Sequence, residues 1–211
     1  MEPKSDRLRT PRAAGLAGIV FAVLLGAAIV LIRLGVPQGG VDAADGTDPD
    51  RKRAVRVALE LVPFAGIFFL WFMGALRARV GDAEDRFVAT VFMGSGLVFV
   101  ASLFGAAAAA GSALNQPQTG EFGRHFAYTL LTTYAMRMAA VFIFASSTIG
   151  HRLGVFPRWL GVLGYLSGLV LLFAGPAFPW SELIFPFWSL VVSVHILRAG
   201  LHARPRKEGA V

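Results

Sequence analysis

The chain has 211 residues, of which 55% are hydrophobic and only 16% are charged. Soluble domains carry roughly 25% charged residues, so the composition argues against a soluble globular protein and for one that is solvated by lipid. There are no cysteines, which excludes disulfides and thiolate metal sites. The net charge of +7 comes from Lys and Arg that lie beside apolar blocks, where they set membrane topology, so nucleic acid is not an expected partner.

Six apolar blocks follow one another along the chain, each close to the ~20 residues that cross a ~30 Å hydrocarbon core. We therefore predict an all-α polytopic membrane helix bundle with one transmembrane domain, residues 13–203, between a basic tail at 1–12 and a second tail at 204–211. The predicted helices cover residues 13–34, 55–77, 87–110, 126–149, 158–176 and 181–201.

The distribution of Lys and Arg predicts the orientation. Six helices put 13 of these residues in the two tails and the second and fourth loops, and six in the other loops. The positive-inside rule then places both termini in the cytoplasm and the protein in the cytoplasmic membrane as a multi-pass protein. The basic cluster at residues 51–53 runs against this rule.

Arg137 is the most informative residue, because it is the only charged residue in the predicted helix 126–149. A guanidinium at the centre of a membrane helix costs ~2.5–3.5 kcal/mol on insertion scales, so it requires a partner or a function. Thr133 and Tyr134 lie one helical turn before Arg137 and present hydroxyl groups on the same face. Three interpretations are open: a structural ion pair, a ligand or ion site, or an Arg that reaches only polar backbone or water.

Glu60 is the best candidate counter-ion. The predicted helices put its Cα roughly 5–9 Å in height from that of Arg137, a gap that an Arg side chain bridges. Glu60 has an alternative partner in Arg56, one turn earlier on its own helix. His195, about one turn from the end of the last helix, is a weaker candidate for a proton-relay residue.

Catalytic and metal-binding motifs are missing from the sequence. It contains no HExxH pattern, no Walker loop, no GxSxG elbow and no dinucleotide-binding glycine fingerprint. We therefore predict no catalytic residues, no metal site and no cofactor, and an enzyme is the least favoured class.

A resemblance to a known family rests on several stretches of the sequence. They are LVPFAGIFFLWFMGALR (61–77), EDRFVATVFMGSGLVFVA (84–101), YAMRMAAVFIFASSTI (134–149) and FPRWLGVLGY (156–165). Together with RAAGLAGIVFAVLLG near the amino terminus, they make the chain similar to a family of uncharacterised multi-pass membrane proteins, a domain of unknown function typical of high-GC bacteria. The resemblance implies a six-helix or similar membrane domain and supplies no activity.

Two function classes remain open. The first is a small-ligand-binding, sensing or transport-accessory protein in which Arg137 and Glu60 line a polar site. The second is a structural or interaction subunit of a membrane complex, in which the same pair only holds helices together. The expected surroundings are the lipid bilayer, and a membrane-protein partner or a second copy of the chain stays open.

Overall fold

The computed structural model describes residues 10–35, 49–80, 86–115, 120–174, 178 and 180–202, which are helical except for 153–157, 178 and 180. The predicted tails therefore lie outside the described residues, apart from the start of the first helix. The helices in chain order are α1 (Thr10–Gly35), α2 (Pro49–Val80), α3 (Arg86–Asn115), α4 (Gly120–Thr129), the π-helix η3 (Leu130–Ala135), α5 (Met136–Arg152), α6 (Arg158–Leu169), the π-helix η4 (Val170–Ala174), the 3₁₀-helix η6 (Ser181–Leu183) and α7 (Ile184–His202).

Five of these helical runs are long and apolar enough to cross a membrane, and a sixth, Arg158–Phe173, is shorter. The predicted all-α membrane bundle is thus confirmed, with one short member. The fourth run is continuous from Gly120 to Arg152 but changes its helix type twice, from α4 to the π-helix η3 and then to α5. Two runs start six residues earlier than expected, at Pro49 instead of 55 and at Gly120 instead of 126, because polar residues there extend the helix past the apolar block.

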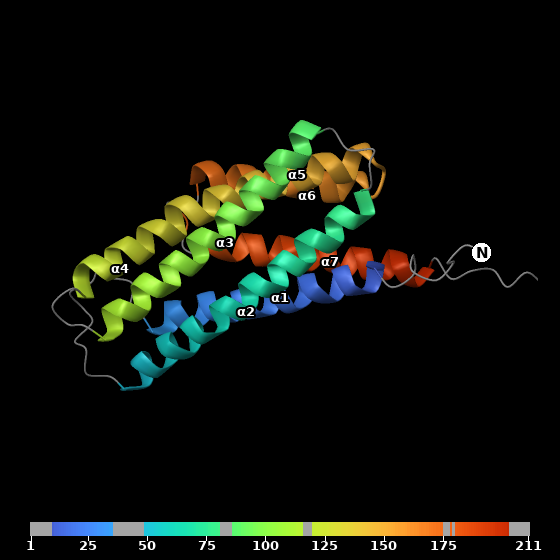
Figure 1. Cartoon of the computed structure of the whole chain (residues 1–211). Helices are drawn as coiled ribbons and strands as arrows, with labels where there is room; N and C mark the ends of the chain where they lie inside the picture. The colour runs from blue at the N-terminus through green and yellow to red at the C-terminus, as the bar shows by residue number, and fades with distance from the viewer. Residues whose placement is uncertain are drawn as a thin grey trace, which may run out of the picture.

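The helices form two layers, with α2, α1 and α7 in one and α3, α5 and α6 in the other (Figure 1). The first and last helices are neighbours, and α2 with α3 and α6 with α7 connect the layers. The described ends of the chain, at Thr10 and His202, lie at the same end of the bundle (Figure 1). We call this the terminal end, and the opposite end the distal end.

Aromatic rings fill the space between the two layers. Phe69 of α2 packs against Phe21, Phe99, Phe142 and Phe185, with ring centroids 4.9–5.8 Å apart. All five side chains are fully buried and come from five different helices. Such tilted and edge-to-face contacts stabilise a core beyond the area that they bury. We call these five rings the ring layer.

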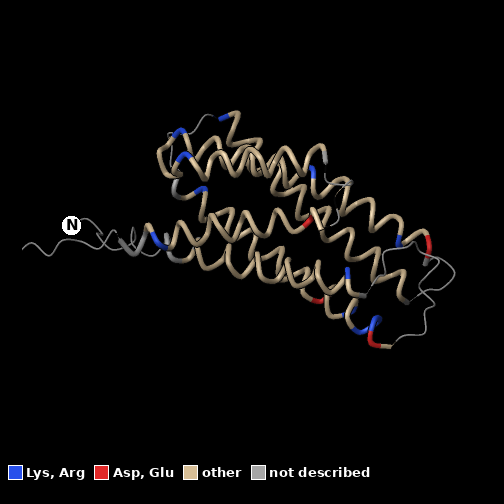
Figure 2. Tube along the Cα trace, turned by 180° about the vertical axis from the view of Figure 1, so that it is seen from behind, with Lys and Arg blue, Asp and Glu red and all other residues tan. Residues whose placement is uncertain are grey.

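Charged residues are concentrated towards the two ends of the bundle, and most of the helix length carries none (Figure 2). The long middle segments are apolar outside as well as inside, as a protein surrounded by lipid requires.

Candidate functional site

Arg137 lies in the first turn of α5, directly after the π-helix η3, and its side chain is exposed. It forms no ion pair or hydrogen bond within the described part of the chain. Tyr134 is exposed on the same helical face, and Thr133 beside it is half-buried. One cation and two hydroxyls are therefore neighbours along this helical run, as the spacing of the three residues requires, and they do not bond to each other.

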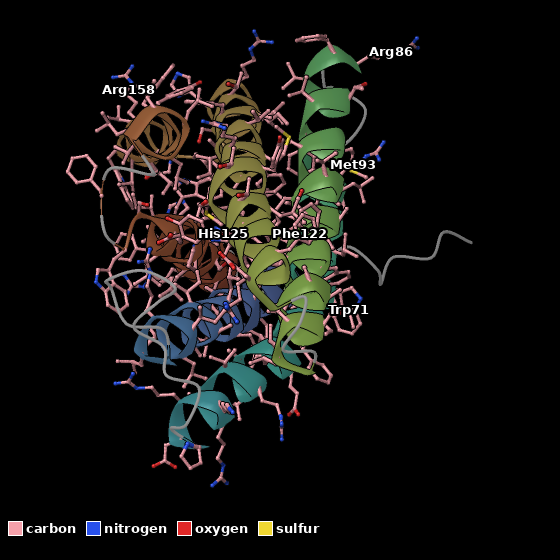
Figure 3. The ribbon with its side chains drawn as sticks, turned by 90° about the vertical axis from the view of Figure 1, so that its left-hand side faces the viewer. Trp71, Arg86, Met93, Phe122, His125 and Arg158 are labelled. Carbon is pink, nitrogen blue, oxygen red and sulfur yellow. The ribbon has the colours of Figure 1, made fainter. Side chains whose placement is uncertain are left out.

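Glu60 lies elsewhere. It belongs to an exposed row on α2 that also contains Val57, Phe64, Ile67 and Trp71, on the outside of the bundle. Figure 3 shows Trp71 at this outer surface.

The expected pairing of Glu60 is not observed, with Arg137 or with Arg56, among the residues that the structure describes. The reason is rotation about the helix axis: α2 meets α5 through Phe69, whose ring is 5.0 Å from that of Phe142, and Glu60 faces away from that contact. Height alone, which the sequence supplies, did not determine which face of α2 the carboxylate occupies.

A different ion pair is present at the distal end. Arg33 in the last turn of α1 donates through Nη2 to both carboxylate oxygens of Glu182, at 2.7 and 2.9 Å. The side chain of Glu182 is 7% exposed and that of Arg33 is 23% exposed. The guanidinium also lies 6.0 Å from the ring centre of Trp180, the residue that enters η6 with a left-handed φ of 70°. This pair ties together the first and last helices.

Sequence reasoning missed this pair, although it held a usable signal. A basic residue in the last turn of the first helix and an acidic one in the first turn of the last helix are both on the distal side, and each is stabilised by its own helix dipole. What the sequence lacked was the fact that α1 and α7 are neighbours.

The heights of Arg137 and Glu182 follow from the ring layer. The rings of Phe142 and Phe185 are 6.1 Å apart. Arg137 is five residues distal to Phe142 and Glu182 is three residues distal to Phe185. At about 1.5 Å per residue these are offsets of about 7.5 and 4.5 Å, so the two residues differ in height by only about 3 Å.

The same side of α5 that carries Arg137 borders α6. Phe144, two turns closer to the terminal end, stacks on Tyr165 with centroids 6.2 Å apart, and Thr148 Oγ1 lies 2.9 Å from the hydroxyl of Tyr165. Gly168 of α6 is so close to Phe144 that an added Cβ would come within 2.8 Å of the ring. The two helices are antiparallel. The seven residues from Phe144 back to Arg137 and the seven residues from Gly168 forward through η4 therefore both lead towards the distal end. Arg137 is therefore level with the distal end of η4, at Ala174.

Two π-helices bracket this position. η3 ends two residues before Arg137 on the same helical run, and η4 is the distal end of the neighbouring run. π-helical turns are uncommon and occur frequently at functional sites. Their coincidence in height at Arg137 is independent of the charge argument and supports the same location.

The other candidates give less. His195 is half-buried on α7, and its ring lies edge-on to Trp159 at 6.2 Å, near the terminal end. No group of three or more His, Cys, Asp or Glu able to hold a metal ion is found among the described residues. Towards the terminal half, Ser147 Oγ and Trp188 Nε1 are buried without a hydrogen-bond partner and converge on Gly164.

We compared the chain with protein-family models, curated proteins and solved structures, and none of the three comparisons found a match.

Proposed function

We propose that the chain is a membrane protein that binds a small anionic group at Arg137, from the distal side of the bilayer. The observation that carries the proposal is an exposed guanidinium, in an otherwise apolar stretch of helix, without an acidic partner in the described part of the chain. Such a charge in a membrane helix is a marker of a site. Ligand binding, sensing and assistance to a transporter are the roles that fit this group.

The depth of Arg137 supports access from the distal side. Arg137 lies fifteen residues before Arg152, which is in the last turn of α5 at the terminal end. This separation is about 22 Å along the helix axis, so Arg137 lies in the distal half of a ~30 Å hydrocarbon core. Side chains on a helix lean towards its amino terminus, which for α5 is the distal end. A long Arg side chain therefore extends towards the distal headgroups, where anions are available.

The distribution of Lys and Arg supports an orientation in which the distal end of the bundle is extracytoplasmic. The excess of Lys and Arg at the terminal end, the basis of the positive-inside rule, supports two cytoplasmic termini in the cytoplasmic membrane. The likeness to uncharacterised bacterial membrane proteins of high-GC genomes belongs to the same proposal and adds no activity to it.

A second candidate is a structural subunit of a membrane complex without a ligand site. The Arg33–Glu182 ion pair favours it, because it shows that this fold uses charge to hold two helices together. In that case Arg137 contacts only headgroups and water, and Glu60, about 13.5 Å distal to the ring layer, is an interfacial residue.

The test is a thermal-shift measurement on purified protein in an uncharged detergent, titrated with inorganic phosphate and small carboxylates. Wild type is compared with Arg137→Gln and, as a control, with Arg124→Gln, which removes an exposed positive charge from the same helical run. A ligand that binds only the folded state raises the melting temperature. We expect an anion-dependent rise in wild type and in Arg124→Gln that is absent in Arg137→Gln. Equal behaviour of all three proteins would favour the structural subunit.

A further inference from the structure

We infer that the anion at Arg137 is the phosphate of a phospholipid in the distal leaflet, with one acyl chain lying along the seam between α5 and α6–η4. The inference rests on the proposed anion site and names the class of molecule that occupies it.

The seam is the exposed side of α5. Within α5, the row Arg137, Val141, Phe144 and Thr148 has exposed or half-buried side chains, whereas most of the remaining residues are buried. These four residues are spaced by three or four positions and therefore share one face. The guanidinium is at the distal end of this row, and the other three present methyl and ring surface.

The opposite wall comes from α6 and η4. Tyr165 is fixed against the α5 row by its stacking on Phe144 and its hydrogen bond with Thr148. Leu169 follows one turn later, and Phe173 lies in η4; both are exposed. Gly168 allows Phe144 to lie directly against the α6 backbone. The surface that runs inward from Arg137 is therefore apolar on both sides.

The length of the seam matches one acyl chain. Arg137 and Thr148 are eleven residues apart, which is about 16 Å along the helix axis. Half of a ~30 Å hydrocarbon core is about 15 Å. A chain that follows the seam from Arg137 therefore passes the ring layer, at Phe142 about 7.5 Å inward, and ends near Thr148, which is a length close to that of one acyl chain.

The polar end suits a phosphate. The Arg guanidinium binds phosphate oxygens through two parallel N–H groups, and charge-assisted bonds of this kind are the strong ones. Tyr134, exposed one turn closer to the distal end, carries a hydroxyl that can donate to a further phosphate oxygen. A free anion would gain the same polar contacts but nothing from the apolar walls, which distinguishes the two sources.

The experiment measures binding of phosphatidylglycerol, a phosphate-bearing phospholipid, to the purified full chain by native mass spectrometry and by thermal shift. Diacylglycerol, which lacks the phosphate, and inorganic phosphate, which lacks the chains, are the two reference ligands. The seam variant is Leu169→Ser, at a side chain that is 47% exposed. Its matched control is Leu97→Ser on α3, at 50% exposure.

We expect Arg137→Gln to weaken phosphatidylglycerol binding about tenfold or more, the effect of losing charged hydrogen bonds. Leu169→Ser should weaken it about threefold through lost apolar contact, and Leu97→Ser should leave it unchanged. Diacylglycerol, which lacks the phosphate, should bind wild type and Arg137→Gln weakly and alike.

Two outcomes overturn the inference and are distinct from each other. If inorganic phosphate gives the full Arg137-dependent shift and Leu169→Ser binds lipid like Leu97→Ser, the anion site stands but its occupant is not a lipid. If neither phosphate nor phospholipid gives a shift that depends on Arg137, the anion site itself is wrong.

Discussion

Two charged residues of this protein show how differently the same side-chain type can be accommodated. Arg33 lies against the buried carboxylate of Glu182, while Arg137 is exposed and has no acidic partner in the described part of the chain. A buried pair depends on both members, since removal of one leaves an uncompensated charge. An exposed charge has no such dependence. Stability and function should therefore separate at these two positions.

The Arg33–Glu182 pair predicts an asymmetric loss of stability. Arg33→Met strands a nearly buried carboxylate and should cost about 3 kcal/mol, towards the low end for a broken buried pair. Glu182→Leu strands the more exposed Arg33 and should cost less. The double variant should be more stable than Arg33→Met alone. Unfolding by denaturant or heat in detergent measures all three, and equal costs with simple additivity would contradict a specific pair.

Glu60 predicts the opposite behaviour. Because its side chain is exposed and bonds to nothing in the described residues, Glu60→Gln should change the unfolding free energy by no more than about 0.5 kcal/mol. The measurement is the same unfolding curve, with Arg137→Gln and the double variant alongside. A coupling above about 1 kcal/mol between the two positions would revive the ion pair that the sequence suggested.

At the scale of the helices, small residues determine how closely α6 approaches its neighbours. Gly164 lies against Ser147 of α5. A Cβ added to this glycine would also lie 3.1 Å from Trp188 Nε1 of α7. Without a hydrophobic drive between helices in lipid, such close contacts are a main source of helix association. Gly164 and Gly168 of α6 are therefore packing residues, and Gly168 also shapes the seam below Arg137 by admitting Phe144.

Gly164→Ala tests this packing. The added methyl group meets Ser147, so either this side chain changes its rotamer or the helices separate, and the expected cost is about 1–3 kcal/mol, as in other overpacked cores. Gly161→Ala, on the same helix with nothing within 4 Å of an added Cβ, is the control. It should be neutral or stabilise the helix by up to about 1 kcal/mol. Thermal unfolding of the two variants under identical conditions decides the point.

At the scale of the whole molecule, one end of the bundle differs from the other. Viewed from the distal end in Figure 3, the start of α4 with Phe122 and His125 lies in front, while Arg86 and Arg158 belong to the far, terminal end. In Figure 1, α3 and α4 extend further in the distal direction than the shorter α6–η4 run. The distal surface is therefore stepped, and Arg137 is level with the end of the short run.

The absence of cysteine from the sequence makes the orientation directly testable. Single substitutions Glu121→Cys at the distal end and Arg158→Cys at the terminal end create one reactive site each. In intact cells, a membrane-impermeant maleimide should label the first and not the second, because the positive-inside rule puts the terminal end in the cytoplasm. Permeabilised cells, where both should react, are the control. The reverse pattern would invert the proposed topology and place Arg137 near the cytoplasmic leaflet.

The sequence by itself determined the fold class and the approximate helix positions, because in lipid every backbone polar group must be satisfied within the helix and apolar length then defines the element. It also identified Arg137, Tyr134 and Thr133 as neighbours, since helical periodicity is a local property. Only the tertiary structure decided which faces meet. Glu60 faces away from α5, Arg33 meets Glu182, and the seam below Arg137 forms, because each depends on how the helices are rotated and which of them are adjacent. Apolar patterning that is similar on all sides of a membrane helix carries little information about that rotation.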